Sequence, residues 1–390
     1  MASSGGFDLG FLGGGQLARM SILAAKRLGI ECVSVDPQED SPAGHVAPSV
    51  TGDLRDPEVI AEVFRNAAVV TLENEFVPAA TIRAALEQAK IEPGRMVPDV
   101  EVLATVQDKL LQRQALNRAG VPSPVAVALE GDGEVAIAKV GFPMMLKQRF
   151  GSYDGRGTVP AHDRKQFHDQ QVHWGQGGWL AETYVPFQRE LAVIAYRWRK
   201  PGVGILEGAF PTMETVQTHH VCDLVFPADT DASEVAIAAV RAIEGFGLFG
   251  VELFQLPDGS VQVNEIAPRP HNTGHYTLDW GGVSQFDQHV RLALGLSPAA
   301  PFGAPTCMAN LLGKPHVGDW RRAMIATLEY DPDIRFHWYE KAESRPGRKM
   351  GHLNAVGVDI VERAKLARDV FYGVWCGGEC DQEPISVSDW

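Results

Sequence analysis

Residues 248–278, LFGVELFQLPDGSVQVNEIAPRPHNTGHYTL, constrain the fold of this chain more than any other stretch. Two apolar runs flank Pro-Asp-Gly, a typical turn sequence, so the stretch predicts a β-hairpin. A four-residue loop over residues 257–260 would pair Leu256 with Val261 and place Glu252 directly opposite Glu265. Opposed side chains on antiparallel strands have Cβ atoms roughly 4.5–5.5 Å apart, and two carboxylates that close repel unless a proton or a cation intervenes.

The opposed glutamates indicate a binding site for a hard divalent cation. Mg²⁺ takes oxygen ligands, typically one or two carboxylates completed by substrate phosphates. Arg269, His271 and Asn272 follow directly, in a polar loop that leaves the end of a strand, where functional residues concentrate. Spacing alone leaves a second interpretation open, an edge hairpin with two solvated glutamates.

Composition limits the class of protein. The chain has 390 residues, enough for two or three domains, and no apolar run long enough to cross a membrane. The N-terminal residues lack a basic segment followed by a cleavage site, so we expect no signal peptide. Five scattered cysteines predict reduced thiols in a cytoplasmic protein. A formal net charge of −14 argues against a nucleic-acid partner.

The N-terminal region predicts a parallel α/β sheet. Residues 7–15 form a strand that enters a glycine turn, residues 16–28 a helix, and residues 31–35 a second strand. Gly13 to Ala18 match G-x-G-x-x-A, with Asp36 about 20 residues further on. A nicotinamide or flavin site, another anionic ligand at the helix N-terminus, and a plain tight turn all remain possible. Glu73 and Glu75 follow the strand over residues 68–72, at the strand end where ligands collect in such sheets.

Two further segments suggest phosphate binding. A strand over residues 142–147 ends in Lys147 and enters a glycine-rich loop over residues 149–158, which we interpret as a cover for phosphates. Residues 339–352 concentrate cations in a Pro-Gly loop and form a candidate phosphate clamp. A flexible hairpin and a solvated basic loop are the respective alternatives. We expect a strand over residues 356–361 and a helix over residues 362–371.

Taken together, these pieces resemble the ATP-grasp superfamily over roughly residues 7–375. Four segments resemble, more closely, the N5-carboxyaminoimidazole ribonucleotide synthases of purine biosynthesis: LGGGQLARM (12–20), GSYDGRG (151–157), NEIAPRPHNTGHYT (264–277) and RPGRKMGHLN (345–354). NEIAPRPHNTGHYT is long and specific. The first segment weighs against a dinucleotide site, because this family uses such a fold without NAD.

The resemblance implies an ATP-grasp fold of mixed α/β and α+β class. It comprises an N-terminal Rossmann-like pre-ATP-grasp domain (1–105), a small lid (106–188), a C-terminal α+β domain with the Mg-ATP site and phosphate clamp (189–376), and a tail (377–390). It implies a ligase that forms a C–N bond: ATP phosphorylates bicarbonate to carboxyphosphate, and the carboxyl group reaches the exocyclic amine of 5-aminoimidazole ribonucleotide. A cytoplasmic homodimer that hands its carbamate to a mutase of the same pathway is also implied.

Site residues carry over by motif. The resemblance assigns Mg²⁺, or Mn²⁺, to Glu252 and Glu265, and catalysis to Arg269, His271 and Tyr153. The implied ATP contacts are Lys109, Lys147, Ser152, Tyr153, Asp154, Gly155, Arg156, Gly157, Thr158, Glu182, Thr183, Tyr184, Val185, Glu190, Gln217, Asn264 and Glu265. The implied ribonucleotide contacts are Gln16, Leu17, Glu73, Glu75, Asp154, Arg156, Asn272, Lys341, Arg348 and Lys349.

Three positions depart from the family pattern. Ser152 replaces a second glycine of the lid loop, Lys109 stands where many members carry arginine, and Gln217 stands where histidine is common. Rival hypotheses are a formate-dependent glycinamide ribonucleotide transformylase, an NAD-dependent oxidoreductase, and a catalytically silent ATP-binding protein. A requirement for formate and glycinamide ribonucleotide would identify the transformylase. Tight NADH binding without affinity for ATP would identify the oxidoreductase.

Overall fold

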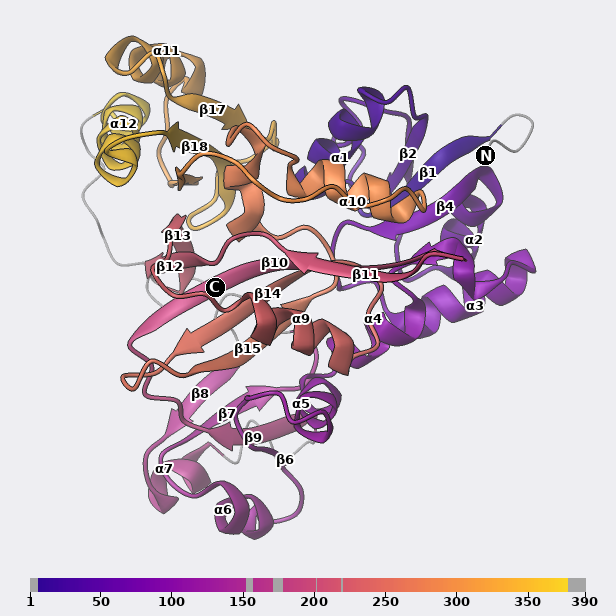
Figure 1. Cartoon of the computed structure of the whole chain (residues 1–390), viewed down its shortest axis with the longest axis vertical. Coiled ribbons are helices and arrows are strands. Elements are labelled where there is room, and N and C mark those ends of the chain that lie inside the picture. The colour runs from indigo at the N-terminus through magenta and orange to yellow at the C-terminus, as the bar shows by residue number, and fades with distance from the viewer. Residues whose placement is uncertain (1–5, 152–156, 171–177, 201, 219, 378–390) are drawn as a thin grey trace.

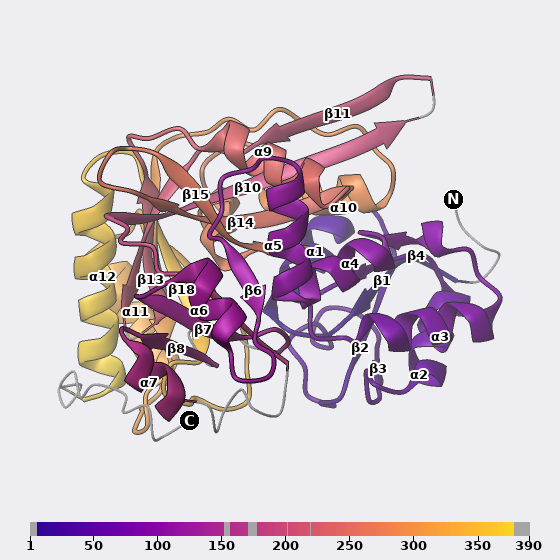
Figure 2. The same cartoon turned by 90° about the horizontal axis from the view of Figure 1, so that it is seen from below.

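The structure is a computed structural model that describes residues 6–151, 157–170, 178–200, 202–218 and 220–377 (Figure 1). Its described strands form three sheets. In both views, the N-terminal sheet and helix α12 (Ile360–Trp375) lie at opposite ends of the molecule (Figure 2). No helix among the described residues is long and apolar enough to span a membrane.

The N-terminal sheet is parallel, with the strand order β3-β2-β1-β4-β5. The expected βαβ opening is confirmed. Asp56 caps α2 by accepting a hydrogen bond from the Glu58 N–H, with Pro57 at the first helical position. The elements are β1 (Phe7–Leu12), α1 (Gln16–Lys26), β2 (Cys32–Asp36), β3 (Ser49–Thr51), α2 (Pro57–Asn66), β4 (Ala67–Leu72), α3 (Ala79–Ala89), the short η1 (Pro93–Arg95), β5 (Met96–Val97) and α4 (Val100–Gln107).

A second, four-stranded sheet is antiparallel and has the order β6-β9-β7-β8. It projects at the lower end of Figure 1, with α6 and α7 packed against it. Met144, Leu146 and Ala181 form its core with Phe167 of α7. The elements are α5 (Lys109–Arg118), β6 (Ala126–Ala128), α6 (Glu134–Val140), β7 (Met144–Gln148), β8 (Thr158–Ala161), α7 (Arg164–Asp169) and β9 (Trp179–Thr183).

The large sheet is antiparallel, with the order β15-β14-β10-β12-β13-β16-β18-β17 and β11 paired to β10. Its first strands are β10 (Arg189–Lys200), β11 (Gly204–Ala209), β12 (Met213–Thr218), β13 (Val221–Pro227), β14 (Gly247–Gln255) and β15 (Val261–Ala267). The remaining strands are β16 (Thr306–Leu312), β17 (Arg335–Trp338) and β18 (Lys349–Val356), and the helical segments are α9 (Ser233–Ala242), η2 (Asn272–Leu278), α10 (Gln285–Ala293), α11 (Trp320–Tyr330) and α12.

The large sheet is covered on both faces, as the alternation of side chains along β10 requires. Val193 packs in a core with Ala239 of α9, whereas Ile194 packs in another with Leu292 of α10. Helix α10 also packs on α1, where Phe286 joins Leu17 and other α1 side chains. The N-terminal sheet and the large sheet therefore share a core through α10.

Three expectations are wrong in part. The strand expected over residues 356–361 ends at Val356, and α12 begins at Ile360. Lys349 to His352 lie in β18 and not in the Pro-Gly loop. Cys376 is disulfide-bonded, whereas Cys32, Cys222 and Cys307 are free thiols, as expected, and all three are buried. The tail over residues 378–390 lies outside the described residues.

Candidate active site

The β14–β15 hairpin is confirmed, but its loop is one residue longer than expected. Gln255 pairs with Val261, and the Leu256 N–H donates a 2.9 Å hydrogen bond to the Ser260 carbonyl. The predicted Leu256–Val261 pair is therefore wrong. Continued along both strands, this register would offset the two glutamates by one position.

A β-bulge cancels that offset. The ladder pairs Leu253 with Val263 but Glu252 with Glu265, so Asn264 is an extra residue on β15. Glu252 and Glu265 consequently lie directly opposite one another, as the sequence predicted. The prediction of this pair is confirmed, although its derivation assumed a shorter loop and a regular ladder.

The bulge also directs two successive polar residues toward one face. Val263 and Ile266 are three positions apart yet pack in the same core beneath α9, which strict alternation would forbid. Asn264 and Glu265 therefore face away from α9, on the same side as Glu252. Three oxygen-bearing side chains suit Mg²⁺, and Mn²⁺ prefers similar ligands. No group of three His, Cys, Asp or Glu side chains among the described residues could hold a metal ion, so Asn264 and ligand phosphates would have to complete the coordination.

An ammonium group and an imidazole each approach one of the two glutamates in this structure. The Lys109 ammonium, in the first turn of α5, forms an ion pair with Glu265. Nε2 of His271 lies 3.5 Å from Oε1 of Glu252. His271 approaches β14 this closely because Gly250 has no side chain: a Cβ there would lie 2.4 Å from the Cβ of His271.

The His271 imidazole is neutral. Burial, followed by the neighbouring Arg269 and Lys349, lowers the pKa of His271 to about 3. Its Nδ1 lies 2.9 Å from the Thr273 hydroxyl, which holds the ring orientation. A pKa this low makes the neutral ring a weak base, which suits it to a proton that is released only after the attacking nitrogen has become strongly acidic.

Arg269 connects the hairpin to the N-terminal sheet. Its guanidinium forms a bidentate ion pair with Glu75, with Nη2 2.9 Å from Oε1. Burial alone would lower the pKa of Arg269, but the charge of Glu75 and its hydrogen bonds raise it above the ordinary value. The charges of Glu73 and Glu265 act on Arg269 in the same direction. Arg269 therefore lies between the predicted metal ligands and the carboxylates that follow β4.

The glycine turn before α1 receives a carboxylate from this protein. The Leu17 N–H donates to Oε1 of Glu73 at 3.3 Å, and a Cβ on Gly15 would lie 2.3 Å from that oxygen. Asp36 accepts a 2.8 Å hydrogen bond from the Gly14 N–H. Glu73 therefore occupies the helix N-terminus where a dinucleotide pyrophosphate would bind, which disfavours the dinucleotide interpretation. Burial raises the pKa of Glu73.

A buried ion-pair triad anchors the antiparallel lid sheet. Glu182 of β9 pairs with Lys147 of β7 through one oxygen and with Arg113 of α5, at 3.1 Å, through the other. Burial would raise the pKa of Glu182, but Arg113 and Lys147 lower it to about 2. Because both carboxylate oxygens of Glu182 are engaged in ion pairs, we expect the backbone groups that follow Glu182 to make the contacts with a bound adenine.

The expected cover loop falls mostly outside the described residues. This applies to Ser152, Tyr153, Asp154, Gly155 and Arg156. The structure describes the two residues that follow them. Gly157 has a φ of +66°, and its carbonyl accepts a hydrogen bond from the Gln148 N–H, and Thr158 begins β8.

The residues expected to contact the adenine and the ribose of ATP lie where the lid sheet joins the large sheet. Thr183 ends β9, and Tyr184 and Val185 follow it in the connection to β10. Glu190 of β10 pairs with Phe254 of β14 on one side, and burial raises the pKa of the Glu190 carboxyl. Gln217 adjoins an irregularity in the ladder between β12 and β13.

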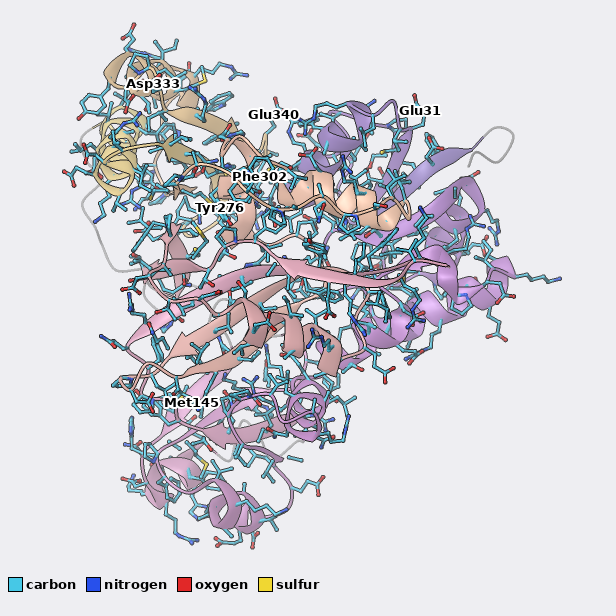
Figure 3. All side chains as sticks on the ribbon, in the orientation of Figure 1. Glu31, Met145, Tyr276, Phe302, Asp333 and Glu340 are labelled. Carbon is cyan, nitrogen blue, oxygen red and sulfur yellow. The ribbon has the colours of Figure 1, made fainter. Side chains whose placement is uncertain are left out.

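The predicted phosphate clamp is cationic and partly buried. Burial, together with the charge of Arg348, lowers the pKa of Lys341 to about 7. Lys349 lies in β18, and its charge acts on both Lys341 and His271. Glu340, between the C-terminal elements and α1 in Figure 3, pairs with Arg19 at 2.9 Å. Lys341 lines a hollow of about 370 Å³ with His45, Trp320, Arg321, Trp338 and Glu340.

The remaining expected residues have mixed positions. Gln16 is the first residue of α1, beside Leu17. Asn272 is buried, and its amide forms reciprocal hydrogen bonds of 3.0 and 2.7 Å with Asn310. Sequence reasoning missed Asn310, Arg113 and the buried Gln285, because no motif marks a residue whose partner is distant in sequence.

Comparisons with known proteins agree with this geometry. Three family models match the chain: the ribonucleotide synthetase preATP-grasp domain over residues 7–107, the ATP-grasp domain over 114–286, and the phosphoribosylaminoimidazole carboxylase C-terminal domain over 306–365. The chain is thus an ATP-grasp ligase with a preATP-grasp domain, as the sequence predicted.

Individual relatives narrow this class. The N5-carboxyaminoimidazole ribonucleotide synthase of Synechococcus elongatus is 36% identical, over 96% of this chain and 97% of its own length. The structure of N5-carboxyaminoimidazole synthase from Aspergillus clavatus in complex with ADP and 5-aminoimidazole ribonucleotide is similar, with a TM-score of 0.81, 30% identity, and coverage of 94% of this chain and 99% of that one. The chain belongs to the N5-carboxyaminoimidazole ribonucleotide synthase family.

Longer fungal proteins match as well. The phosphoribosylaminoimidazole carboxylase of Ogataea methanolica is 35% identical, over 91% of this chain but 67% of its own length. The chain therefore spans about two thirds of the length of these fungal relatives.

Proposed function

We propose that this enzyme uses ATP and bicarbonate to carboxylate the exocyclic amine of 5-aminoimidazole ribonucleotide. A bicarbonate oxygen attacks the γ-phosphorus of ATP, which gives carboxyphosphate and ADP. The amine then attacks the carboxyl carbon of carboxyphosphate or of the CO₂ released from it, loses a proton, and the N5-carbamate and phosphate result. One observation carries the proposal: Glu252 and Glu265 oppose one another beside Arg269 and His271.

ATP would lie between the lid sheet and the large sheet. Glu252 and Glu265 would hold Mg²⁺, with Asn264 beside them on the same face, and Mn²⁺ is an acceptable substitute. The metal, when bound, would offset negative charge on the phosphates as the γ-phosphoryl group moves. Lys109 would exchange its ion pair with Glu265 for a nucleotide phosphate. The further nucleotide contacts that we propose are Lys147, Gly157, Thr158, Thr183, Tyr184, Val185, Glu190 and Gln217, with Ser152, Tyr153, Asp154, Gly155 and Arg156 in the cover loop and Glu182 supporting Lys147.

Arg269 and His271 would act on the reacting groups. Arg269 is preorganised by Glu75 and would stabilise negative charge on bicarbonate and phosphate without reorientation. The neutral His271 would accept the proton that the amine loses. The cover loop, with Tyr153, would exclude water from carboxyphosphate, which hydrolyses readily.

The ribonucleotide would lie between the N-terminal sheet and β18. Lys341 and Arg348, with Lys349, would clamp its 5′-phosphate, since guanidinium and ammonium groups both bind phosphate. Gln16, Leu17, Glu73, Glu75, Asp154, Arg156 and Asn272 would contact its ribose and base. Because the amide of Asn272 is engaged with Asn310, that contact would require the amide pair to rearrange.

We also propose the domain limits 1–105, 106–188 and 189–376, a homodimer, cytoplasmic localisation, and transfer of the carbamate to a mutase. The limits follow the separation of the three sheets along the chain. Sedimentation of the purified protein tests the homodimer directly.

ADP release tests the proposed function. With Mg²⁺ and ATP, ADP release should require both bicarbonate and 5-aminoimidazole ribonucleotide for its full rate, and carbamate trapped at high pH should match the ADP formed. Glu265→Ala should abolish ADP release, whereas its fold, measured by circular dichroism, should be unchanged. A requirement for formate and glycinamide ribonucleotide instead would contradict the proposal.

A further inference from the structure

Gln285, the first residue of α10, forms an unusual set of hydrogen bonds with the loop that carries His271. Its side chain is fully buried. Its Oε1 accepts a 2.9 Å hydrogen bond from the His271 N–H, and its Nε2 donates a 2.8 Å hydrogen bond to the His271 carbonyl. A single side-chain amide thus satisfies both backbone polar groups of His271, as a neighbouring strand would.

The amide orientation of Gln285 follows from these partners. A backbone N–H can only donate and a carbonyl can only accept, so Oε1 faces the first and Nε2 the second. Nε2 also lies 2.9 Å from Nδ1 of His275, which must therefore accept. The proton of the neutral His275 ring is consequently on Nε2, so Gln285 fixes the tautomer of His275 as well as the backbone of His271.

The loop is shaped around this amide. A Cβ on Gly274 would lie 2.4 Å from Oε1 of Gln285, so only glycine leaves room for the amide there. The Gln285 N–H donates to the Thr277 hydroxyl at 2.9 Å, and that hydroxyl donates to the Gly274 carbonyl at 2.6 Å. The segment from His271 to Thr277 is thus tied to the start of α10 at four points.

Helix α10 holds this loop in a fixed relation to α1. Ser284 and Asp287 form a capping box that fixes the first turn of α10. Phe286, in this first turn, and Val290 pack in a core with Leu17 and other residues of α1. The beginning of α1, which carries Gln16, is part of the proposed ribonucleotide site. Gln285 therefore connects the backbone of His271 with the element that would hold the amine substrate.

We propose that Gln285 is a positioning residue for carboxyl transfer: it holds His271 at the distance from the ribonucleotide that amine attack requires. This inference rests on the function proposed above for the site. Phosphorylation of bicarbonate needs the metal ligands and Arg269. Attack of the amine on the carboxyl carbon needs, in addition, His271 at the correct distance from the amine. Loss of the Gln285 clamp should therefore uncouple ADP formation from carbamate formation.

Gln285→Glu tests this with little change in size. The carboxylate can still accept from the His271 N–H, but it places an acceptor against the His271 carbonyl and against Nδ1 of His275. Because a misplacement of about 1 Å can cost about 100-fold in rate, we expect carbamate formation to fall by about 10- to 100-fold. Bicarbonate-dependent ADP release should persist, so the ratio of ADP to carbamate should rise well above one, and the KM for ATP should stay within twofold.

Gln288 provides a matched control on the same helix. It is also fully buried, and its amide clamps the backbone of Ala299, instead of that of His271, through two hydrogen bonds of 3.0 Å. Gln288→Glu should lower the melting temperature about as much as Gln285→Glu does. It should nevertheless leave the ratio of ADP to carbamate near one. Gln285→Met, which removes the clamp without adding charge, should show the same uncoupling and serves if the glutamate variant does not fold.

The outcomes separate the two proposals. If the unmodified enzyme shows no bicarbonate-dependent ADP release, the proposed function fails and with it this inference. If the unmodified enzyme is coupled and both Gln285 variants lose ADP and carbamate in equal proportion, as Gln288→Glu would, Gln285 has only a structural role and the inference is overturned.

Discussion

Replacement of Glu182 by glutamine should destabilise the lid and shows how much the buried triad contributes. The side chains of Glu182 and Arg113 are 4% and 5% exposed. The fall of the Glu182 pKa from 4.5 to about 2 corresponds to about 3 kcal/mol of differential stability. Breaking a buried ion pair by removing one partner typically costs 3–5 kcal/mol, which agrees with that figure. We therefore expect Glu182→Gln to lower the free energy of unfolding by about 3 kcal/mol.

The pH dependence of this loss has a defined sign. The folded-state pKa of Glu182 is depressed, so its stabilising contribution is complete above the ordinary carboxyl pKa of about 4.5 and disappears as the pH falls toward 2. Urea unfolding followed by tryptophan fluorescence should give the same difference between unmodified protein and variant at pH 8 and pH 5.5. Below pH 4.5 the difference should shrink.

Glu190→Gln is the matched control for stability. Burial raises the pKa of Glu190, so loss of its charge should leave the free energy of unfolding unchanged or slightly higher at pH 7. The reasoning would be refuted if Glu182→Gln were as stable as the unmodified protein at pH 8. It would also be refuted if both glutamine variants lost the same stability.

Two further substitutions test the proposed ribonucleotide site. Gly15→Ala should raise the KM for 5-aminoimidazole ribonucleotide and leave the KM for ATP unchanged, because the added Cβ would displace Glu73. An equal change in both KM values would contradict this prediction. Lys341→Met should raise the melting temperature at pH 6–7, because burial disfavours the ammonium and stability rises with pH between about 7 and 10.5. The same variant should raise the KM for the ribonucleotide, and a lower melting temperature with unchanged KM would count against the clamp.

The β14–β15 hairpin shows both the reach and the limit of sequence reasoning. Pro-Asp-Gly and the flanking apolar runs located the turn, and NEIAPRPHNTGHYT indicated the family. The bulge at Asn264 left no mark in the residue pattern, because a regular ladder with a shorter loop opposes the same two glutamates. The predicted pairing of Glu252 with Glu265 is therefore correct, but a five-residue loop and a bulge produce it, and not the four-residue loop and regular ladder that we assumed.

Contacts between distant segments could not be predicted in the same way. Arg269 and Glu75 are 194 positions apart, and no local pattern relates them. The Glu182 triad joins strands and a helix that only the folded lid brings together. Gln285 lies outside every recognised motif, and only the backbone of His271 reveals its role. Local periodicity found the elements, whereas these pairings depend on the tertiary fold.

The fate of bicarbonate oxygen tests the central claim most directly. Bicarbonate labelled with ¹⁸O should be incubated with the enzyme, Mg²⁺, ATP and 5-aminoimidazole ribonucleotide, and the released phosphate analysed by mass spectrometry. If the opposed Glu252 and Glu265 support phosphorylation of bicarbonate, one labelled oxygen should appear in each phosphate that is formed together with carbamate. Phosphate without the label, formed at the same rate as carbamate, would contradict the account.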